Sequence, residues 1–176
     1  MASFVYSGAQ LCFIAFMTVQ LTAIVHLSLV RAGYALAIYQ VSGAIARPIW
    51  GWIADRYIPP FRAVAALGFG MAGCAIAASQ LSPAWSFPAV LLLGVLSGST
   101  ATGFTGLAYA EYARLGGARR TEATGLGTAV MFAGVMLLPS TFGGLVSALD
   151  GYAIAYLILA ALVVVSSVPL IGVRLL

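Results

Sequence analysis

The sequence predicts an all-α integral membrane protein with six transmembrane helices. Of its 176 residues, 62% are apolar and only 7% are charged, and the mean hydropathy is +1.07. A soluble domain carries about 25% charged residues, so this chain cannot cover a water-facing surface. Apolar runs of about 20 residues, long enough to cross the hydrocarbon core, follow one another almost without a break. Inside hydrocarbon each run must pair its own backbone amides, which favours helices.

Charged or Pro/Gly-rich connections separate the six apolar segments. The predicted helices span residues 4–29, 34–54, 63–81, 87–110, 123–148 and 152–173, which form one domain over residues 1–176. The first helix has no basic stretch before it, and its apolar run is too long for a signal peptide. The second helix ends before Asp55, and the third lies between Arg62 and Pro83.

The last three helices are bounded in the same way. The fourth helix lies between Pro83 and Glu111, and the fifth lies between Glu122 and Asp150. The sixth follows Gly151 and is the most continuous apolar run before the C-terminus. None of the six alternates polar and apolar residues as an outer-membrane strand would.

The arginines predict the orientation of the helices. The connections 55–62 and 111–122 and the C-terminus hold Arg56, Arg62, Arg114, Arg119, Arg120 and Arg174, whereas the other three connections hold only Arg31. Basic residues are enriched in cytoplasmic loops. We therefore expect a multi-pass protein of the inner (plasma) membrane with both termini in the cytoplasm. The net charge of +4 reflects this topology and not nucleic-acid binding, because no soluble basic face exists.

The lengths of the connections group the helices into two triplets. The central helix of the first triplet contains Gly43 and Pro48, and the central helix of the second contains Gly134 and Pro139. An interruption at comparable places in two halves is typical of transporters built from inverted repeats. The sequence thus predicts two three-helix inverted repeats.

The end of the second predicted helix carries the most specific motif. It reads Gly51-Trp-Ile-Ala-Asp55-Arg56, and Arg62 follows. This motif resembles the signature loop of the major facilitator superfamily, in the copy between helices eight and nine. The resemblance implies a conformational latch, in which Asp55 faces the positive N-terminus of an adjacent helix and Arg56 pairs with an acidic residue. Residues 57–60, Tyr-Ile-Pro-Pro, replace the glycine that usually follows this Asp-Arg pair.

Two further stretches occur in the order of the same family. Residues 103–125 resemble the tenth helix with its inner loop, and residues 134–144 resemble the eleventh helix. In this interpretation Glu111 and Arg114 lie one turn apart, and Glu111 pairs with Arg56 as an intradomain latch. The resemblance covers the whole chain as helices seven to twelve, half of the family's fold. It implies transport of a small organic solute by alternating access, with a second six-helix half from a separate chain or a second copy.

The family uses the first helix of each triplet to line the central cavity. On the first predicted helix, a narrow arc at 100° per residue holds Tyr6, Gln10, Met17 and Gln20. Amide side chains are costly in hydrocarbon unless they meet a partner, water or substrate. These four residues are therefore candidates for the substrate cavity. The alternative is that Gln10 and Gln20 only bond neighbouring helices.

Three further cavity candidates come from the other helices. Ser99 and Thr102 belong to a run of small and hydroxylated residues in the fourth helix. This run either lines a substrate path or forms a packing face whose hydroxyls bond the preceding turn. Arg47 is the one charge well inside a span. It either faces a cavity and binds an anionic group or extends to the inner surface.

Enzymatic and metal-dependent functions are not indicated. A single histidine, His26, and two isolated cysteines, Cys12 and Cys74, do not suit a metal site. The sequence contains no P-loop, no Gly-x-Ser-x-Gly motif and no pair of carboxylates within the spans. We expect no cofactor and no catalysis. Two other functions remain open: a six-helix substrate-binding subunit of a multi-component importer, or a non-functional transporter fragment.

Overall fold

A computed structural model describes residues 1–172, which form six α-helices and one 3₁₀ turn. The elements are α1 (Ala2–Ala23), α2 (Leu29–Arg56), α3 (Pro60–Ser79), α4 (Phe87–Gly116), η1 (Gly117–Arg119), α5 (Arg120–Ala148) and α6 (Tyr152–Ile171). By length and hydropathy, α1, α2, α3, α6 and the stretch Phe87–Ala148, which holds α4 and α5, are suited to cross a membrane. The prediction of an all-helical membrane fold is confirmed.

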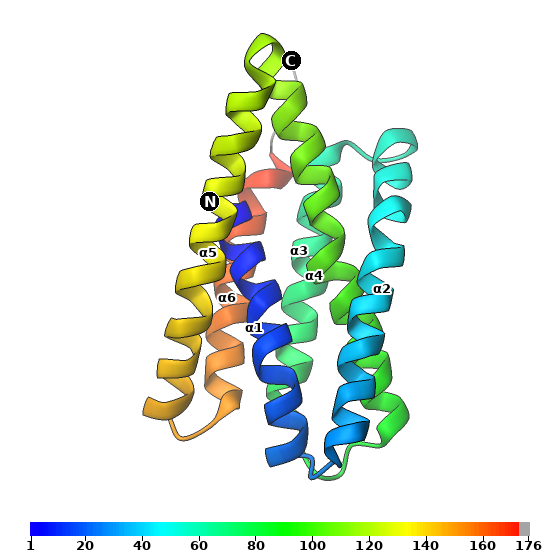
Figure 1. Ribbon diagram of the computed structural model, residues 1–176, viewed down its shortest axis with the longest axis vertical. Coiled ribbons are helices and arrows are strands. Elements are labelled where there is room, and N and C mark those ends of the chain that lie inside the picture. The colour runs from blue at the N-terminus through cyan, green and yellow to red at the C-terminus, as the bar shows by residue number, and fades with distance from the viewer. Residues whose placement is uncertain (173–176) are drawn as a thin grey trace.

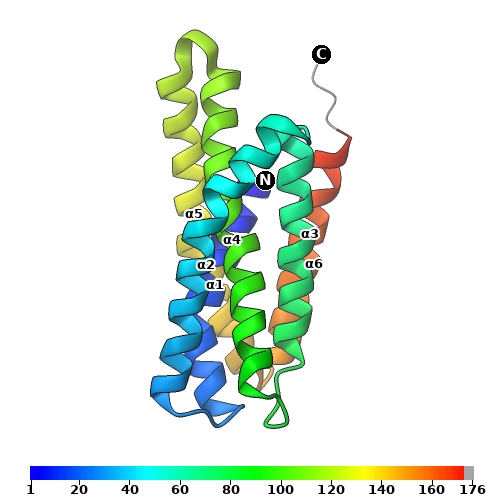
Figure 2. The same ribbon diagram turned by 90° about the vertical axis from the view of Figure 1, so that its right-hand side faces the viewer.

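The helices form an elongated bundle in which the most extensive contacts join α2 to α4, α1 to α5 and α3 to α6. Four aromatic rings, those of Phe13, Tyr39, Phe142 and Tyr156, pack together in its core. The hairpin of α4 and α5 projects beyond the other helices at one end (Figures 1 and 2). We call this end, which carries the α2–α3 and α4–α5 connections, the arginine-rich end.

Some helix ends differ from the hydropathy pattern. α1 ends at Ala23, although the apolar run continues, because the chain turns through a left-handed residue at His26 (φ 57°). Ser28 then begins α2 by accepting a hydrogen bond from the backbone N–H of Arg31. At the other end, α4 continues to Gly116, past the charges that mark its expected end. Residue 173, the expected end of the sixth helix, lies outside the described residues.

Two helix crossings bring backbones into direct contact. At Gly134 of α5, an added Cβ would overlap the carbonyl oxygen of Phe4 in α1. At Gly98 of α4, an added Cβ would overlap the carbonyl oxygen of Tyr39 in α2. Small residues permit such close approach between membrane helices. These glycines therefore set the separation of α1 from α5 and of α2 from α4.

Two fully buried tyrosines should respond in opposite ways to loss of the hydroxyl. The hydroxyl of Tyr6 lies 2.6 Å from Oγ of Ser167, whereas that of Tyr156 has no partner among the described residues. We expect Tyr6→Phe to lower the free energy of unfolding by about 1 kcal/mol and Tyr156→Phe to raise it by about 1 kcal/mol. SDS-induced unfolding in mixed micelles measures both changes. Shifts of the same sign would contradict this account.

Candidate functional site

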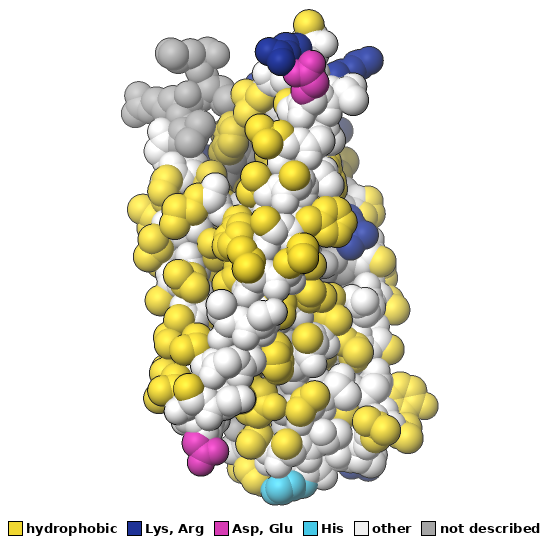
Figure 3. Space-filling view, turned by 60° about the vertical axis from the view of Figure 1, so that its left-hand side comes forward, with side chains coloured by type: hydrophobic (Ala, Val, Ile, Leu, Met, Phe, Trp, Pro, Cys, Tyr) yellow, Lys and Arg dark blue, Asp and Glu magenta, His cyan; other side chains and the backbone are white. Residues whose placement is uncertain are grey.

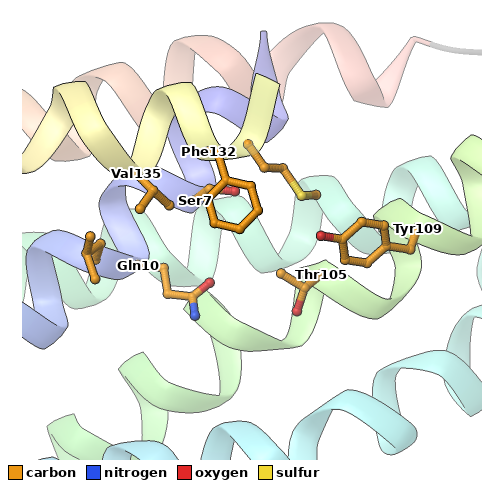
Figure 4. A pocket seen from close by; sticks show the side chains of 8 residues that line it. Ser7, Gln10, Thr105, Tyr109, Phe132 and Val135 are labelled. Carbon is orange, nitrogen blue, oxygen red and sulfur yellow. The ribbon is translucent and has the colours of Figure 1, made fainter. Parts of the chain in front are cut away.

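A pocket of about 140 Å³ opens between α1, α4 and α5 (Figure 4). Its lining consists of Ser7, Gln10 and Leu11 from α1, Thr105 and Tyr109 from α4, and Met131, Phe132 and Val135 from α5. We call it the α1–α4–α5 pocket. It combines four polar side chains with an apolar wall on the flank of a largely apolar bundle.

The polar groups of this pocket retain hydrogen-bonding capacity. Ser7 is only 4% exposed, and its Oγ has no partner among the described residues. Gln10 accepts a bond from Tyr39 through its backbone carbonyl, which leaves its amide group free. Thr105 donates to the carbonyl oxygen of Thr102 at 2.6 Å, so its oxygen can still accept. The Oγ of Ser7 is enclosed by protein atoms, whereas the Gln10 amide and the Thr105 oxygen are available to water or a solute in the pocket.

An aromatic contact positions the end of the pocket at Tyr109. The ring of Tyr109 packs edge-on against Tyr112, with ring centroids 6.3 Å apart. The hydroxyl of Tyr112 donates a hydrogen bond to Oγ of Ser3 in α1. Gly127 of α5 leaves the space that the Tyr112 ring fills, because a Cβ there would overlap the ring. This one side chain thus ties α4 to both other helices of the pocket.

Three of the four α1 candidates lie inside the bundle and not in the pocket. Tyr6, Met17 and Gln20 are at most 5% exposed. The amide nitrogen of Gln20 donates to the carbonyl oxygen of Ala78 in α3 at 2.8 Å, as the packing alternative expects. Only Gln10 lines the α1–α4–α5 pocket.

The predicted arc of α1 is its buried face. Tyr6 packs edge-on against Phe104 of α4, so this arc points into the core. The pocket side lies about 100° further round the helix, at Ser7, because each residue turns an α-helix by that angle. Sequence reasoning did not select Ser7, Thr105 or Tyr109, which line this pocket. The signal that could have found them is the spacing of polar residues, i to i+3 for Ser7 and Gln10 and i to i+4 for Thr105 and Tyr109.

The remaining cavity candidates surround the contact of α2 with α4. Thr102 is buried against Gly43 and donates to the carbonyl oxygen of Gly98 at 2.5 Å. Ser99 lines a separate apolar groove between α2 and α4. Arg47 is exposed on α2 and is in neither ion pair of the described residues. None of the three candidates lines the α1–α4–α5 pocket.

The charges at the arginine-rich end pair in a different way from the sequence prediction. Glu111 is 5% exposed, and its Oε2 accepts bonds from Nε and Nη2 of Arg114 at 3.0 and 2.6 Å. The expected pair of Glu111 with Arg56 is absent from the described residues, because Arg114 already holds the carboxylate in a bidentate geometry. Arg119 and Glu122 form a second, exposed pair on the hairpin.

The residues of the Asp-Arg loop have no ionic partner within the described chain. Asp55, Arg56 and Arg62 are exposed, and neither of the two ion pairs includes them. A Cβ added at Gly51 would meet no other atom, so no described helix of this chain approaches closely there. The described residues therefore leave these three charged side chains uncovered.

The described residues form a multi-pass helical membrane protein with a polar pocket on its flank. On the face shown in Figure 3, charged side chains gather mainly at the two ends of the bundle, and apolar side chains cover its length. No group of three potential metal ligands occurs in the described part of the chain. An uncommitted polar pocket within apolar helices is typical of proteins that move solutes across membranes.

Comparison with known proteins identifies the family. The family model described as Major Facilitator Superfamily matches residues 1–176. The chain belongs to this superfamily, a family of secondary transporters, and the resemblance noted in the sequence is confirmed. A comparison with curated proteins found no match.

Proposed function

We propose that this chain is helices seven to twelve of a transporter that moves a small organic solute by alternating access. The observation that carries this proposal is the α1–α4–α5 pocket, in which Gln10 and Tyr109 present polar groups without a partner among the described residues. Polar groups are costly against lipid, so this flank of the bundle faces a solute path. Because the pocket is open on that flank, a second six-helix half encloses the solute, from a separate chain or a second copy.

The packing of the helices supports an organisation as two three-helix inverted repeats. Pro48 follows Gly43 by five residues in α2, and Pro139 follows Gly134 by the same number in α5. Gly43 faces α4, and Gly134 faces α1. Exchange of α1 with α4, α2 with α5 and α3 with α6 converts the α2–α4 contact into the α1–α5 contact and maps the α3–α6 contact onto itself. Such symmetry is the structural counterpart of repeated halves in transporters.

We place the protein in the inner (plasma) membrane. The distribution of arginines supports an orientation in which both termini lie in the cytoplasm. The α2–α3 and α4–α5 connections and the residues beside them carry Arg56, Arg62, Arg114, Arg119 and Arg120. The opposite end carries Arg31. A cytoplasmic arginine-rich end agrees with the rule for basic loops. Arg174, which also entered the sequence prediction, lies outside the described residues.

We assign the latch to the surface between the two halves. Asp55, Arg56 and Arg62 are exposed and have no ionic partner within residues 1–172, and Gly51 leaves room for a helix of the second half. The pair of the buried Glu111 with the exposed Arg114 fixes the neighbouring end of α4. In this arrangement the latch closes the cytoplasmic side of the solute path when the halves meet there.

Cysteine accessibility tests whether the α1–α4–α5 pocket faces water. In membranes, Thr105→Cys should react at least about tenfold faster with a charged, membrane-impermeant methanethiosulfonate than Val165→Cys, because only a hydrated thiol forms the reactive thiolate. Val165 is 59% exposed on α6, and the proposal places it against lipid. The unsubstituted chain supplies the background, since Cys12 and Cys74 are buried. Equal rates at the two positions would contradict a solute path along this flank.

A further inference from the structure

No charged side chain lines the α1–α4–α5 pocket among the described residues. Glu111 and Arg114, which follow Tyr109 on α4, are bound to each other. Arg47 lies on α2, a helix that contributes nothing to the lining. A charged solute group in this pocket would leave water without gaining a counter-charge, which is strongly unfavourable.

The apolar wall of the pocket suits a single planar ring. The side chains of Phe132 and Val135 lie across the pocket from those of Gln10 and Thr105 (Figure 4). The volume of about 140 Å³ is close to the roughly 150 Å³ of an apolar protein cavity that takes up benzene. The ring of a solute can therefore lie against Phe132 while its substituent points to α1 and α4.

The polar side of the pocket offers both donors and acceptors. The hydroxyl of Tyr109 can donate or accept and the Gln10 amide can do both at once, so the assigned bonds do not depend on Thr105. We propose that the α1–α4–α5 pocket binds an uncharged aromatic group that carries a carboxamide or hydroxyl substituent, as the part of the transported solute held by this half. This inference rests on the proposed function, because it takes the pocket to lie in the solute path.

Three compounds of similar shape and different charge test this specificity. Benzamide is neutral, benzoate is an anion and benzylamine is a cation near neutral pH. At equal millimolar concentrations, benzamide should slow the labelling of Thr105→Cys at least about threefold, the effect of a ligand present at twice its dissociation constant. Benzoate and benzylamine should leave the labelling rate within the scatter of the measurement. The rate of the same reagent with a free thiol in solution corrects for direct effects of each compound.

The outcomes separate this inference from the proposed function. If Thr105→Cys is no more reactive than Val165→Cys, the proposed solute path fails. If Thr105→Cys is labelled rapidly but benzoate or benzylamine protects it as well as benzamide does, only the neutral specificity fails. Rapid labelling that no compound slows also overturns the specificity and leaves the path intact.

A pair of tyrosine substitutions tests the assigned hydrogen bond. In the Thr105→Cys background, Tyr109→Phe should raise the benzamide concentration that halves the labelling rate at least about threefold, because one neutral hydrogen bond is lost. Tyr34→Phe is the matched control, since Tyr34 is 62% exposed on α2 and does not line this pocket. An equal benzamide concentration in the two variants would remove Tyr109 from the site.

Discussion

Replacement of Gly134 by alanine should lower the free energy of unfolding by about 2 kcal/mol, the cost of forcing an extra carbon into a packed contact. A Cβ at this position would overlap the carbonyl oxygen, carbonyl carbon and Cα of Phe4. Backbone atoms cannot rotate away as a side chain does, so α1 and α5 must separate. Separation also loosens the neighbouring contact of Gly8 with Leu138. SDS-induced unfolding of the purified protein in mixed micelles measures the change.

The same helix provides the control for this substitution. A Cβ at Gly144 would meet no other atom, so Gly144→Ala introduces no clash. Alanine favours a helix over glycine by roughly 1 kcal/mol, and this variant should be as stable as the parent chain or more stable. A loss of stability in Gly144→Ala equal to that in Gly134→Ala would show that the close crossing is not the cause.

Replacement of Asp55 by asparagine should shift the equilibrium between the outward-open and inward-open states toward the inward-open state by about tenfold. A factor of this size is within the interaction energy of one charge with a helix N-terminus. The substitution keeps the shape of the side chain and removes its charge. On the proposed arrangement, the latch then holds the cytoplasmic side closed less well. In the Thr105→Cys background, labelling should become faster in inside-out vesicles and slower in right-side-out vesicles.

Asp150 provides the matched control for Asp55. It is an exposed aspartate near the opposite end of the bundle, between α5 and α6. Its φ of 51° is a conformation that asparagine also tolerates. Asp150→Asn should leave both labelling rates unchanged. If Asp55→Asn behaves in the same way as Asp150→Asn, the loop is not a latch.

The fold was predictable because hydrocarbon restricts a chain to few structures. The apolar runs and the family motifs indicate an all-helical membrane protein of the major facilitator superfamily, and both conclusions are confirmed. The helix ends were less predictable, since hydropathy does not record backbone turns. The apolar residues after Ala23 predict that the helix continues, whereas the chain turns at His26, which has a left-handed backbone conformation.

The site was less predictable, because polar residues in membrane helices satisfy two different demands. Gln20 and Thr102 bond backbone carbonyls inside the bundle, whereas Ser7 and Gln10 line an open pocket. In sequence, both kinds are isolated polar residues among apolar ones. The partner of Glu111 was equally ambiguous, because Arg56 and Arg114 are both reasonable from charge alone. The choice between them depends on the continuation of α4 beyond residue 110.

The two glycine crossings have a mechanical consequence. Where α1 meets α5 at Gly134 and α2 meets α4 at Gly98, backbone contacts backbone, and the only side chain among the nearest atoms is the short Ser42 beside Gly98. We therefore expect each crossing to permit small rotations of one helix against the other and to resist sliding along the helix axes. Because the bundle contains two such crossings, we expect its six helices to move together as one rigid body. In the proposed function, the movement that opens the solute path then occurs where this bundle meets the second six-helix half over the α1–α4–α5 pocket.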